Sequence, residues 1–474
     1  MRRVPFGCGE ARTIAAMAIN RVIGTAIRRS GRGGGTAFPG MVATRIAPDL
    51  LDRLAKRLPA GSVVVAGTNG KTTTTRMISD IFKRTGLNVA HNRTGSNLVR
   101  GIAGAFADQM PIAGRGPDIG VVEADENAFP EVVRRVQPRV VLLLNLFRDQ
   151  LDRYGELESI AASWRPVIRA LGSEVILCVN ADDPRLARLA AESSARVVTF
   201  GMSTAETSLS EMPHAADAAY CPVCGARFEH AAIYLGHLGD WICRVCDASR
   251  PPLNLTVSEI APDGFERQQL TIEGWPPDES FTLDLALPGV YNAYNVLAAA
   301  SVACALGMPR DCVISAASSF RPAFGRLERV NLDGRQLILA LAKNPTGFNE
   351  VLRMLVSTGF DGSAMIGIND LDADGRDVSW LWDVDFEVLA ERNLPVIAAG
   401  IRGHDLALRM TYAGLDAGLL DGTVAGLPFA RVVDHLLDTS KPGDRIFVLL
   451  TYTAMLQLRS VLAERGVVEQ FWEE

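Results

Sequence analysis

A glycine turn between an apolar run and a helical segment sets the fold class of this chain, in the stretch SVVVAGTNGKTTTT, residues 62–75. The apolar run is typical of a buried strand, and Lys71 and Thr72 open the helical segment. Backbone N–H groups of such a turn bind phosphate oxygens, the lysine adds a positive charge, and the threonine hydroxyl can bind Mg²⁺. The motif predicts an ATP- and Mg²⁺-binding loop, although Val65 stands where the strict motif has glycine and a turn without a ligand is the alternative. The loop residues that we assign to ATP are Gly67, Thr68, Asn69, Gly70, Lys71, Thr72 and Thr73.

Apolar runs continue along the chain with the spacing of an α/β fold. Near-continuous Val/Ile/Leu runs indicate strands covered on both faces, hence a mostly parallel sheet packed between helices. Two stretches that alternate polar and apolar residues, 253–260 and 267–275, predict antiparallel strands that rejoin the same domain. The runs predicted as buried strands are 62–67, 119–126, 139–146, 174–180 and 195–201.

A second α/β series follows the segment FRPAFGRLERV, residues 320–330. Its predicted strands lie within 335–345, 363–370, 394–400 and 445–455. We therefore expect a short helical segment (1–60), an ATP-binding domain (61–330) and a Rossmann-like α/β domain at the C-terminal end (331–474).

Charge and hydropathy argue against several classes of protein. A formal net charge of -6 is unusual for a dedicated nucleic-acid binder, so we expect no nucleic-acid partner. No apolar run approaches the about 20 residues that a membrane span needs, and the arginine-containing N-terminus lacks a continuous signal-peptide core. We expect a cytoplasmic protein whose first helix is either a plain surface helix or an amphipathic helix at the inner face of the cell membrane.

Four of the eight cysteines form two C-x-x-C pairs, CPVC and CRVC. Cys221, Cys224, Cys243 and Cys246 predict a tetrahedral zinc site in a small ribbon, inserted at about 211–250. Two disulfides or a redox pair are the alternatives. Because four cysteines complete the zinc shell, we interpret His230 and His237 as surface residues.

Polar side chains follow several predicted strands. Functional groups gather at the carboxyl ends of strands in open parallel sheets, and Glu123, Asp125 and Asn145 lie at such ends. The Glu123 carboxylate, opposite Thr72, would complete a magnesium site; a solvated acidic turn is the alternative.

Six motifs, in chain order, resemble the central ATPase domain of the Mur ligases, a fold that folylpolyglutamate synthases share. They are GTNGKTTT, EADE, NLFRDQLDRYGE, VNADDP, LPGVYNAYNVLAAA and FGRLE. The resemblance implies that the γ-phosphate of ATP passes to a carboxylate and that an amine attacks the resulting acyl phosphate. It also implies nucleotide contacts by Asn292, Asn295 and Arg326.

The chain departs from the usual Mur ligase pattern at several places. Only about sixty residues precede the loop, where Mur ligases carry a domain that grips a UDP group. Asp149-Gln150 stands where the family commonly has Asp-His, and 162–170 contains no lysine to be carbamylated, which leaves a second magnesium site open. AKNP replaces AHNP at residues 342–345.

These departures occur together with the four cysteines and the stretches ADGRDVSWLWDVDFE and LLTYTAM. With this combination the chain resembles the MurT family, the synthetase subunits of lipid II isoglutaminyl synthase. The resemblance implies ATP-dependent amidation of the D-isoglutamyl α-carboxyl of the lipid II stem peptide. It also implies a GatD-type glutaminase subunit that supplies ammonia. No cysteine of this chain lies in a glycine-flanked nucleophile elbow, which agrees with a separate glutaminase.

The segment 369–387 contains six aspartates, in a stretch typical of a solvated acidic loop. The MurT resemblance implies that one C-terminal aspartate orients the catalytic histidine of the partner, as the third member of a triad. Asp377, near the turn glycine Gly375, and Asp383, after Trp382, are the two candidates. Asp383 could instead cap a helix, and the sequence does not separate the two.

Two other functions stay open at the level of sequence. A Mur-type ligase that adds an amino acid, as folylpolyglutamate synthase does, would need its own amino-acid pocket and no glutaminase. A nucleic-acid-binding ATPase would need a basic surface around the cysteines, whereas CPVCGARFEH and CRVCDASR are close to neutral.

Overall fold

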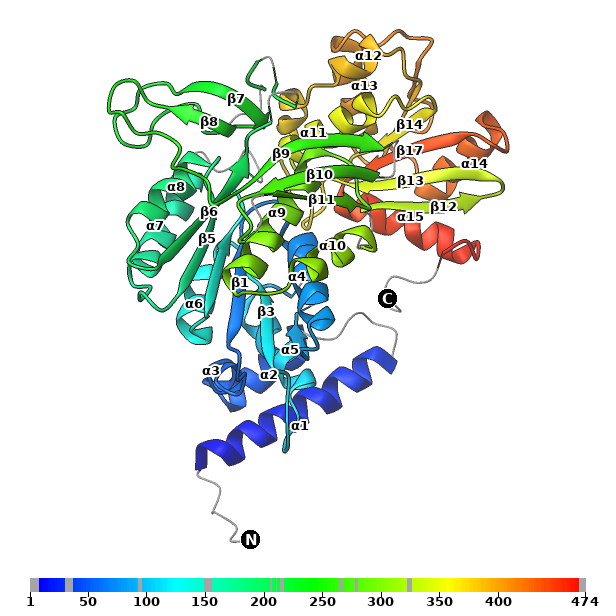
Figure 1. Cartoon of the computed structure of the whole chain (residues 1–474). Helices are drawn as coiled ribbons and strands as arrows, with labels where there is room; N and C mark the ends of the chain where they lie inside the picture. Colours follow the sequence, from blue (N-terminus) through cyan, green and yellow to red (C-terminus); the bar gives the residue numbers. More distant parts are fainter. Residues whose placement is uncertain are drawn as a thin grey trace.

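The computed structural model of this chain contains two large sheets, with helices on both faces of their parallel strands (Figure 1). The fold is α/β, as predicted, and the sheets are mostly parallel. The structure describes residues 8–29, 37–92, 96–148, 156–204, 207–209, 211–213, 217–263, 267–277, 280–321 and 326–468.

The first sheet has nine strands in the order β11-β10-β9-β6-β5-β4-β1-β3-β2. The strands from β6 to β2 are parallel, β9 joins β6 in parallel, and β10 and β11 then fold back antiparallel. The five predicted buried strands and the two predicted antiparallel strands are confirmed. The three-residue edge strand β2 and the strand β11 were not predicted. The bounds are β1 (Ser62–Ala66), β2 (Val89–His91), β3 (Ile119–Glu123), β4 (Val140–Leu143), β5 (Ile176–Asn180), β6 (Arg196–Met202), β9 (Leu255–Asp263), β10 (Arg267–Glu273) and β11 (Ser280–Leu285).

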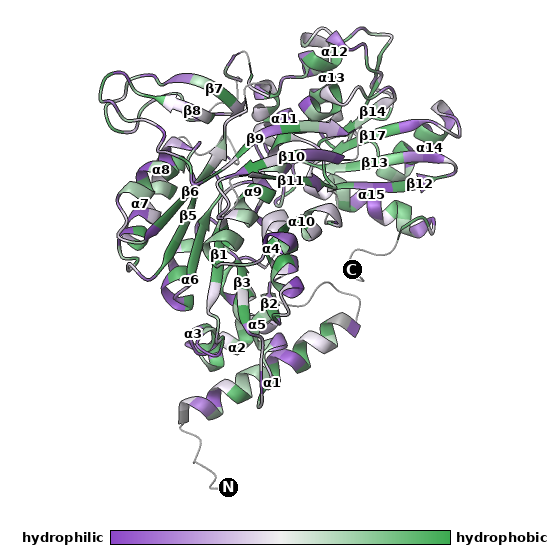
Figure 2. Ribbon diagram, in the orientation of Figure 1, coloured by the Kyte–Doolittle hydropathy of each residue, from purple (hydrophilic) through white to green (hydrophobic). Residues whose placement is uncertain are grey.

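Alternate side chains of the central strands enter two separate cores. Val63 and Val65 of β1 pack with α4, α9 and α10, whereas Val64 and Ala66 pack with the helices of the opposite face. Figure 2 shows the resulting apolar centre of the sheet. The helices of this domain are α4 (Lys71–Arg84), α5 (Val99–Gln109), α6 (Phe129–Val136), α7 (Glu156–Arg169), α8 (Pro184–Ala191), α9 (Val290–Ala305) and α10 (Arg310–Ser318).

Three N-terminal helices close one end of the first sheet: α1 (Cys8–Arg29), α2 (Ala37–Ile46) and α3 (Leu50–Ala55). Asn20 of α1 is fully buried and donates hydrogen bonds to Gly104 O (3.0 Å) and Asp108 Oδ1 (2.8 Å) of α5. The helix is therefore attached to the domain by a specific polar contact. Of the helices that the structure describes, none combines the length and the apolar content that crossing a membrane requires.

The cysteine-containing segment forms its own small unit on the first domain. Its strands β7 (Glu229–Leu235) and β8 (Leu238–Ile242) make a two-stranded antiparallel hairpin. Trp241 Nε1 donates to Ala181 O at 3.1 Å, and Trp241 packs with Phe228 and Ala187. The ribbon is thereby anchored on the start of α8.

The second sheet has six strands in the order β12-β13-β17-β14-β15-β16, and only β12 is antiparallel. The four strands predicted for this domain are present, with β12 and β16 added at the two edges. The strands are β12 (Arg326–Leu332), β13 (Arg335–Leu341), β14 (Ser363–Gly367), β15 (Val396–Ala399), β16 (Leu420–Asp421) and β17 (Arg445–Leu450). The helices are α11 (Pro345–Ser357), the 3₁₀ turn η1 (Ser379–Asp383), α12 (Glu387–Glu391), α13 (Gly403–Tyr412), α14 (Phe429–Thr439) and α15 (Tyr452–Glu464).

Candidate active site

The loop between β1 and α4 is shaped by two glycines with positive φ. Gly67 (φ +146) and Gly70 (φ +87) adopt backbone conformations that other residues rarely take. A Cβ on Gly70 would lie 2.1 Å from Oδ1 of Asn295, so the position has no room for a side chain. Lys71 then begins α4, whose first N–H groups have no acceptor within the helix and can bind an anion.

Asn145, two residues after β4, holds this loop in place. Its Oδ1 accepts the N–H of Asn69 at 2.8 Å and its Nδ2 donates to Asn69 O at 3.1 Å. The Thr68 hydroxyl donates to Phe147 O at 3.0 Å and accepts the Phe147 N–H at 3.1 Å. The loop is therefore rigidly attached to the neighbouring strand.

The Lys71 side chain is buried inside the loop. Its Nζ donates to Gly67 O and to Thr68 O and forms an ion pair with Glu126 Oε1 at 3.2 Å. Glu126 was missed in the sequence, where we considered only the first two acids of EADE. This carboxylate balances the charge of the buried lysine.

Glu123 ends β3. Its side chain and that of Thr72 both line a cavity next to the glycine-containing loop. The Asn92 side chain fixes the backbone of Glu123, accepting its N–H and donating to its carbonyl oxygen, both at 2.9 Å. A carboxylate and a hydroxyl on one cavity wall are hard oxygen donors of the kind that Mg²⁺ prefers. The donor set therefore fits the predicted magnesium site.

Asn292 and Asn295 lie in the first turns of α9, as predicted, beside α4. Asn295 Oδ1 accepts the Thr74 hydroxyl at 3.3 Å, and Asn295 Nδ2 donates to Asn292 Oδ1 at 3.3 Å. Asn292 in turn donates to Pro288 O at 2.7 Å. Both side chains line the cavity beside the glycine loop.

A cavity of about 280 Å³ lies between the two domains and collects most of these residues. Its wall on the C-terminal side comes from the end of β13 and the start of α11, including Lys343, Asn344 and Glu350. Asn344 caps α11, since its Oδ1 accepts the Gly347 N–H at 2.8 Å. Its Nδ2 donates to Asn69 Oδ1 at 3.2 Å and so joins the two domains at the loop. The sequence pointed to AKNP only as a departure from a family motif.

Glu350 of α11 is the least expected residue of the cavity wall. Its side chain is 8% exposed, and Arg353 Nη1 lies 3.8 Å from its Oε1. Burial raises the pKa of Glu350 to about 7, with Arg353 opposing this shift and Asp385 adding to it. No sequence signal singled out this glutamate.

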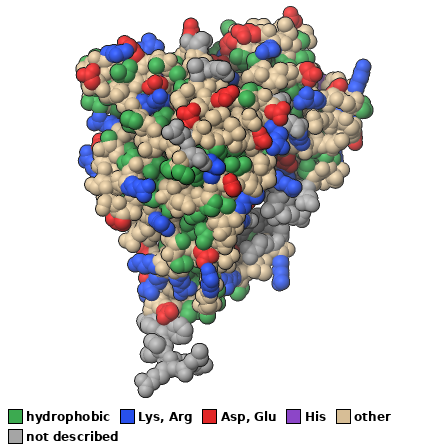
Figure 3. All heavy atoms as spheres, viewed as in Figure 1, with side chains coloured by type: hydrophobic (Ala, Val, Ile, Leu, Met, Phe, Trp, Pro, Cys, Tyr) green, Lys and Arg blue, Asp and Glu red, His purple; other side chains and the backbone are tan. Residues whose placement is uncertain are grey.

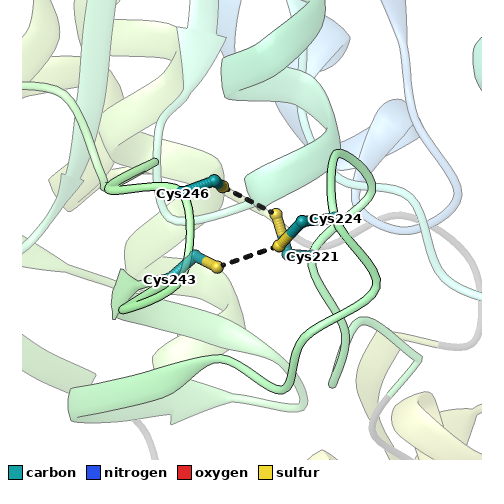
Figure 4. A group of neighbouring side chains, drawn as sticks. All are labelled: Cys221, Cys224, Cys243 and Cys246. Carbon is teal, nitrogen blue, oxygen red and sulfur yellow. Dashed lines mark hydrogen bonds between the residues drawn. The ribbon is translucent and has the colours of Figure 1, made fainter.

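The four ribbon cysteines converge, as predicted (Figure 4). All four are free, and their sulfurs lie within 4.8 Å of one another. The Sγ atoms of Cys221 and Cys246 are 3.6 Å apart, and those of Cys224 and Cys243 are 3.4 Å apart. Tetrahedral thiolates around a zinc ion would be separated by about 3.8 Å. The cluster therefore fits a four-coordinate metal ion and leaves no ligand position for substrate.

The prediction that the ribbon histidines are surface residues is wrong for His237, which is fully buried, and His230 is half-buried. His237 lies in the turn between β7 and β8, and its ring packs 4.7 Å from that of Phe147. Its Nε2 is 3.4 Å from Asp183 Oδ2. Two apolar side chains that flank this turn, Leu235 and Leu238, line the cavity, so the ribbon tip belongs to the active-site wall.

The C-terminal domain also contacts the ribbon directly. Arg353 donates to Tyr234 O and to Thr207 O, both at 2.6 Å. Because Arg353 and Glu350 share one face of α11, the ribbon, the helix and the cavity form one continuous structure.

The two candidate aspartates differ in their surroundings. The Asp377 carboxylate accepts the Ser379 N–H at 2.7 Å, which shapes its own turn. Asp383 Oδ2 lies 4.0 Å from Arg148 Nη2 of the first domain, and Trp382 beside it is exposed. Neither carboxylate lines the interdomain cavity as the structure describes it.

Some of the predicted features lie outside the described residues. The side chain of Arg326, the first residue of β12, is one of them. The segment 149–155, which begins with the Asp149-Gln150 pair, is another.

Two family models match the chain. The model of the Mur ligase middle domain matches residues 65–234, and the model of the MurT ligase C-terminal domain matches residues 341–455. Among solved structures, a pseudomurein peptide ligase type C from Methanothermus fervidus has the same fold, with a TM-score of 0.63 at 20% identity over 85% of this chain and 78% of that one.

Two curated relatives are similar over most of their length. A lipid II isoglutaminyl synthase (glutamine-hydrolyzing) subunit MurT from Streptococcus pneumoniae strain R6 is 30% identical over 441 residues, covering 92% of this chain and 94% of the relative. The subunit of the same name from Staphylococcus aureus strain COL is 32% identical over 389 residues, covering 81% and 85%.

Proposed function

Because the chain belongs to the family of MurT subunits, we propose that it is the ATP-using subunit of a lipid II isoglutaminyl synthase. It amidates the α-carboxyl of the D-isoglutamyl residue in the lipid II stem peptide during peptidoglycan synthesis. The observation that carries this proposal is similarity along nearly the whole chain, combined with a cavity that unites the loop of one domain with α11 of the other.

The residues around the cavity suit an acyl phosphate mechanism. When bound, ATP supplies the phosphoryl group that activates the substrate carboxylate. Lys71 and the first turn of α4 hold the β- and γ-phosphates, and Thr72 and Glu123 bind Mg²⁺. The remaining nucleotide contacts that we assign are Gly67, Thr68, Asn69, Gly70, Thr73, Asn292, Asn295 and Arg326.

The contact between the domains positions the two walls of the cavity. The hydrogen bond between Asn344 and Asn69 holds α11 against the glycine loop, and the cavity lies between them. An acyl phosphate is already reactive, so positioning of the attacking amine accounts for most of the catalysis. Ammonia has to enter this cavity unprotonated.

A GatD-type glutaminase subunit supplies that ammonia and docks on the C-terminal domain. An exposed aromatic cluster supports this assignment: Trp382 is 54% exposed, Tyr412 is 72% exposed, and their ring centroids lie 5.5 Å apart. Leu408, one turn before Tyr412 on α13, adds to the cluster. Asp383 adjoins it, which suits a carboxylate that reaches the histidine of the partner.

We assign zinc to the four cysteines, in a structural role. Four thiolates complete a tetrahedral shell, so the ion has no open position for water or substrate. Its role is to hold the ribbon whose tip lines the cavity.

We place the protein at the inner face of the cell membrane, where a lipid-linked substrate would be found. Ile19 and Val22 are exposed one turn apart on α1, and Phe38 of α2 is exposed as well. Figure 3 shows Lys and Arg side chains at the end of the molecule formed by α1 and α3. Exposed apolar and basic groups together suit an anionic lipid surface.

Reconstitution tests the function directly. The chain is combined with a GatD-type glutaminase, lipid II, ATP and glutamine, and the stem peptide is analysed by mass spectrometry. We expect replacement of one carboxyl OH by NH₂. When the chain is assayed without the glutaminase, glutamine should not support amidation. A high concentration of ammonium salt should then restore part of the amidation. Addition of glutamate to a folate or peptide substrate instead would show that the amino-acid ligase alternative is correct.

A further inference from the structure

Glu350 is a buried carboxylate that the phosphate-binding machinery does not use. It is placed by α11, whose cap Asn344 touches the glycine loop, and it lies six residues further along the helix. Six residues of α-helix correspond to a rise of about 9 Å, so the carboxylate lies beyond the loop along the cavity wall. The substrate carboxyl that receives a phosphoryl group from this loop must lie in the same cavity.

The surroundings of Glu350 leave it available for proton transfer. Arg353, its nearest cation, is 3.8 Å away and already donates to the carbonyls of Tyr234 and Thr207. No described residue donates a hydrogen bond to the Glu350 carboxylate, although the residue is only 7% exposed. A buried acceptor that lines a cavity and lacks a donor suits a reactant that brings its own N–H group.

We propose that Glu350 accepts the proton that the attacking nitrogen loses during amidation, an inference that rests on the proposed function. The ammonia lone pair forms a bond to the carbonyl carbon of the acyl phosphate. The bond between this carbon and the phosphate oxygen breaks, and its electron pair leaves with the phosphate. One N–H proton of the new C–NH₃⁺ group passes to the Glu350 carboxylate, which leaves a neutral amide and a neutral carboxyl.

The surroundings of Glu350 bring its pKa close to the pH at which a general base works. Burial and Asp385 raise the pKa of Glu350 and Arg353 opposes them, which brings it to about 7. A general base works best when its pKa is near the working pH, because it then accepts and releases the proton readily. The other ionisable groups that line the cavity are Lys71, Lys343, Glu123, Asp125, Glu126, Tyr291 and Tyr294.

The decisive variant is Glu350→Gln, which keeps the size and polarity of the side chain but cannot accept the proton. We expect kcat of ammonium-driven amidation to fall by about 100-fold or more. Acyl phosphate formation, measured by positional isotope exchange in oxygen-labelled ATP without ammonia, should be retained. Glu391→Gln, the same change at an exposed position on the neighbouring α12, is the matched control and should leave both rates unchanged.

The pH profile separates a proton acceptor from a structural residue. At a fixed concentration of free ammonia, the wild-type rate should rise with pH up to about 7 and then level off, and the Glu350→Gln variant should lack this rise. Glu350→Asp, which keeps a carboxylate, should recover part of the rate and the rise. An unchanged kcat in Glu350→Gln, or loss of isotope exchange together with amidation, would overturn the inference. Failure of the wild-type protein to amidate lipid II would instead refute the proposed function.

Discussion

Asn344 of the C-terminal domain donates a hydrogen bond from Nδ2 to Oδ1 of Asn69, 3.2 Å away in the glycine loop. The same side chain caps α11 through its Oδ1. One residue thus orders the helix that carries Glu350 and joins this helix to the loop that we assign to ATP.

Replacing Asn344 by serine should separate these two roles. Serine keeps an oxygen for the helix cap but is too short to reach Asn69, so the free energy of unfolding should change by less than about 1 kcal/mol. Loss of one neutral hydrogen bond should raise KM for ATP by about fivefold to tenfold. The control is Asn349→Ser on the same helix. The Asn349 side chain contacts the backbone of Asp383 and Asp385, away from the loop, so this substitution should leave KM for ATP unchanged.

Lys71→Ala should yield a folded protein that lacks amidation. The lysine is the only cation of the glycine loop, and removing such a transition-state charge should reduce kcat by at least about 100-fold. Rates are compared with Lys56→Ala, an exposed lysine after α3, and folding is checked by circular dichroism. Wild-type activity in Lys71→Ala would exclude the loop as the ATP site.

Cys221→Ser should reduce bound zinc to well below one ion per chain, measured by elemental analysis. Because the ribbon tip lines the cavity, we also expect a lower melting temperature and a lower kcat. Cys312→Ser, at a half-buried cysteine of α10, is the control and should retain zinc. A metal-free variant as stable and active as the parent would contradict a structural role for the ion.

Asp377→Asn and Asp383→Asn test our proposal that this chain contributes an aspartate to the catalytic triad of the glutaminase. One of them should abolish glutamine hydrolysis by the complex while ammonium-driven amidation continues. Asp372→Asn, in the same loop with a 90% exposed side chain, should leave both activities intact. If both aspartate variants hydrolyse glutamine normally, the glutaminase completes its triad without this chain.

The pH dependence of stability should reveal the buried Glu350 independently of activity. Its pKa rises from 4.5 to about 7 on folding, so the folded state holds an extra proton between these values. Stability linked to this proton is complete below pH 4.5 and is lost as pH rises through about 7. Relative to Glu350→Gln, the wild-type protein should therefore lose up to about 3 kcal/mol of unfolding free energy between pH 4.5 and 8, measured by urea denaturation.

Local signals in the sequence were sufficient to predict much of the fold and part of the candidate site. The glycine loop, the strands that follow it and the four cysteines depend on short-range chemistry that spacing reveals. Short edge strands such as β2 and β16 carry few apolar residues and leave almost no periodic signal. The buried strands of both sheets were long enough to be recognised.

The features that the sequence did not reveal depend on contacts between distant segments. Glu350 and Glu126 look like ordinary surface acids in a helix and a turn until the fold places them on the cavity wall. His237 was interpreted as a surface residue because the four cysteines leave it no role as a metal ligand, whereas its ring packs on Phe147. The link between Asn69 and Asn344 spans 275 positions, which no local pattern can indicate.

With a metal ion assigned to the four cysteines, the ribbon hairpin makes one wall of the cavity dependent on an ion held elsewhere in the same insertion. A two-stranded hairpin is barely stable alone, so the position of its tip depends on what anchors it. Here the anchors are the cysteine cluster and the packing of Trp241 and His237. A shortage of the metal in the growth medium would thus act on cell-wall chemistry without any change in substrate or ATP supply, and a chelator would inhibit the enzyme without entering its active site.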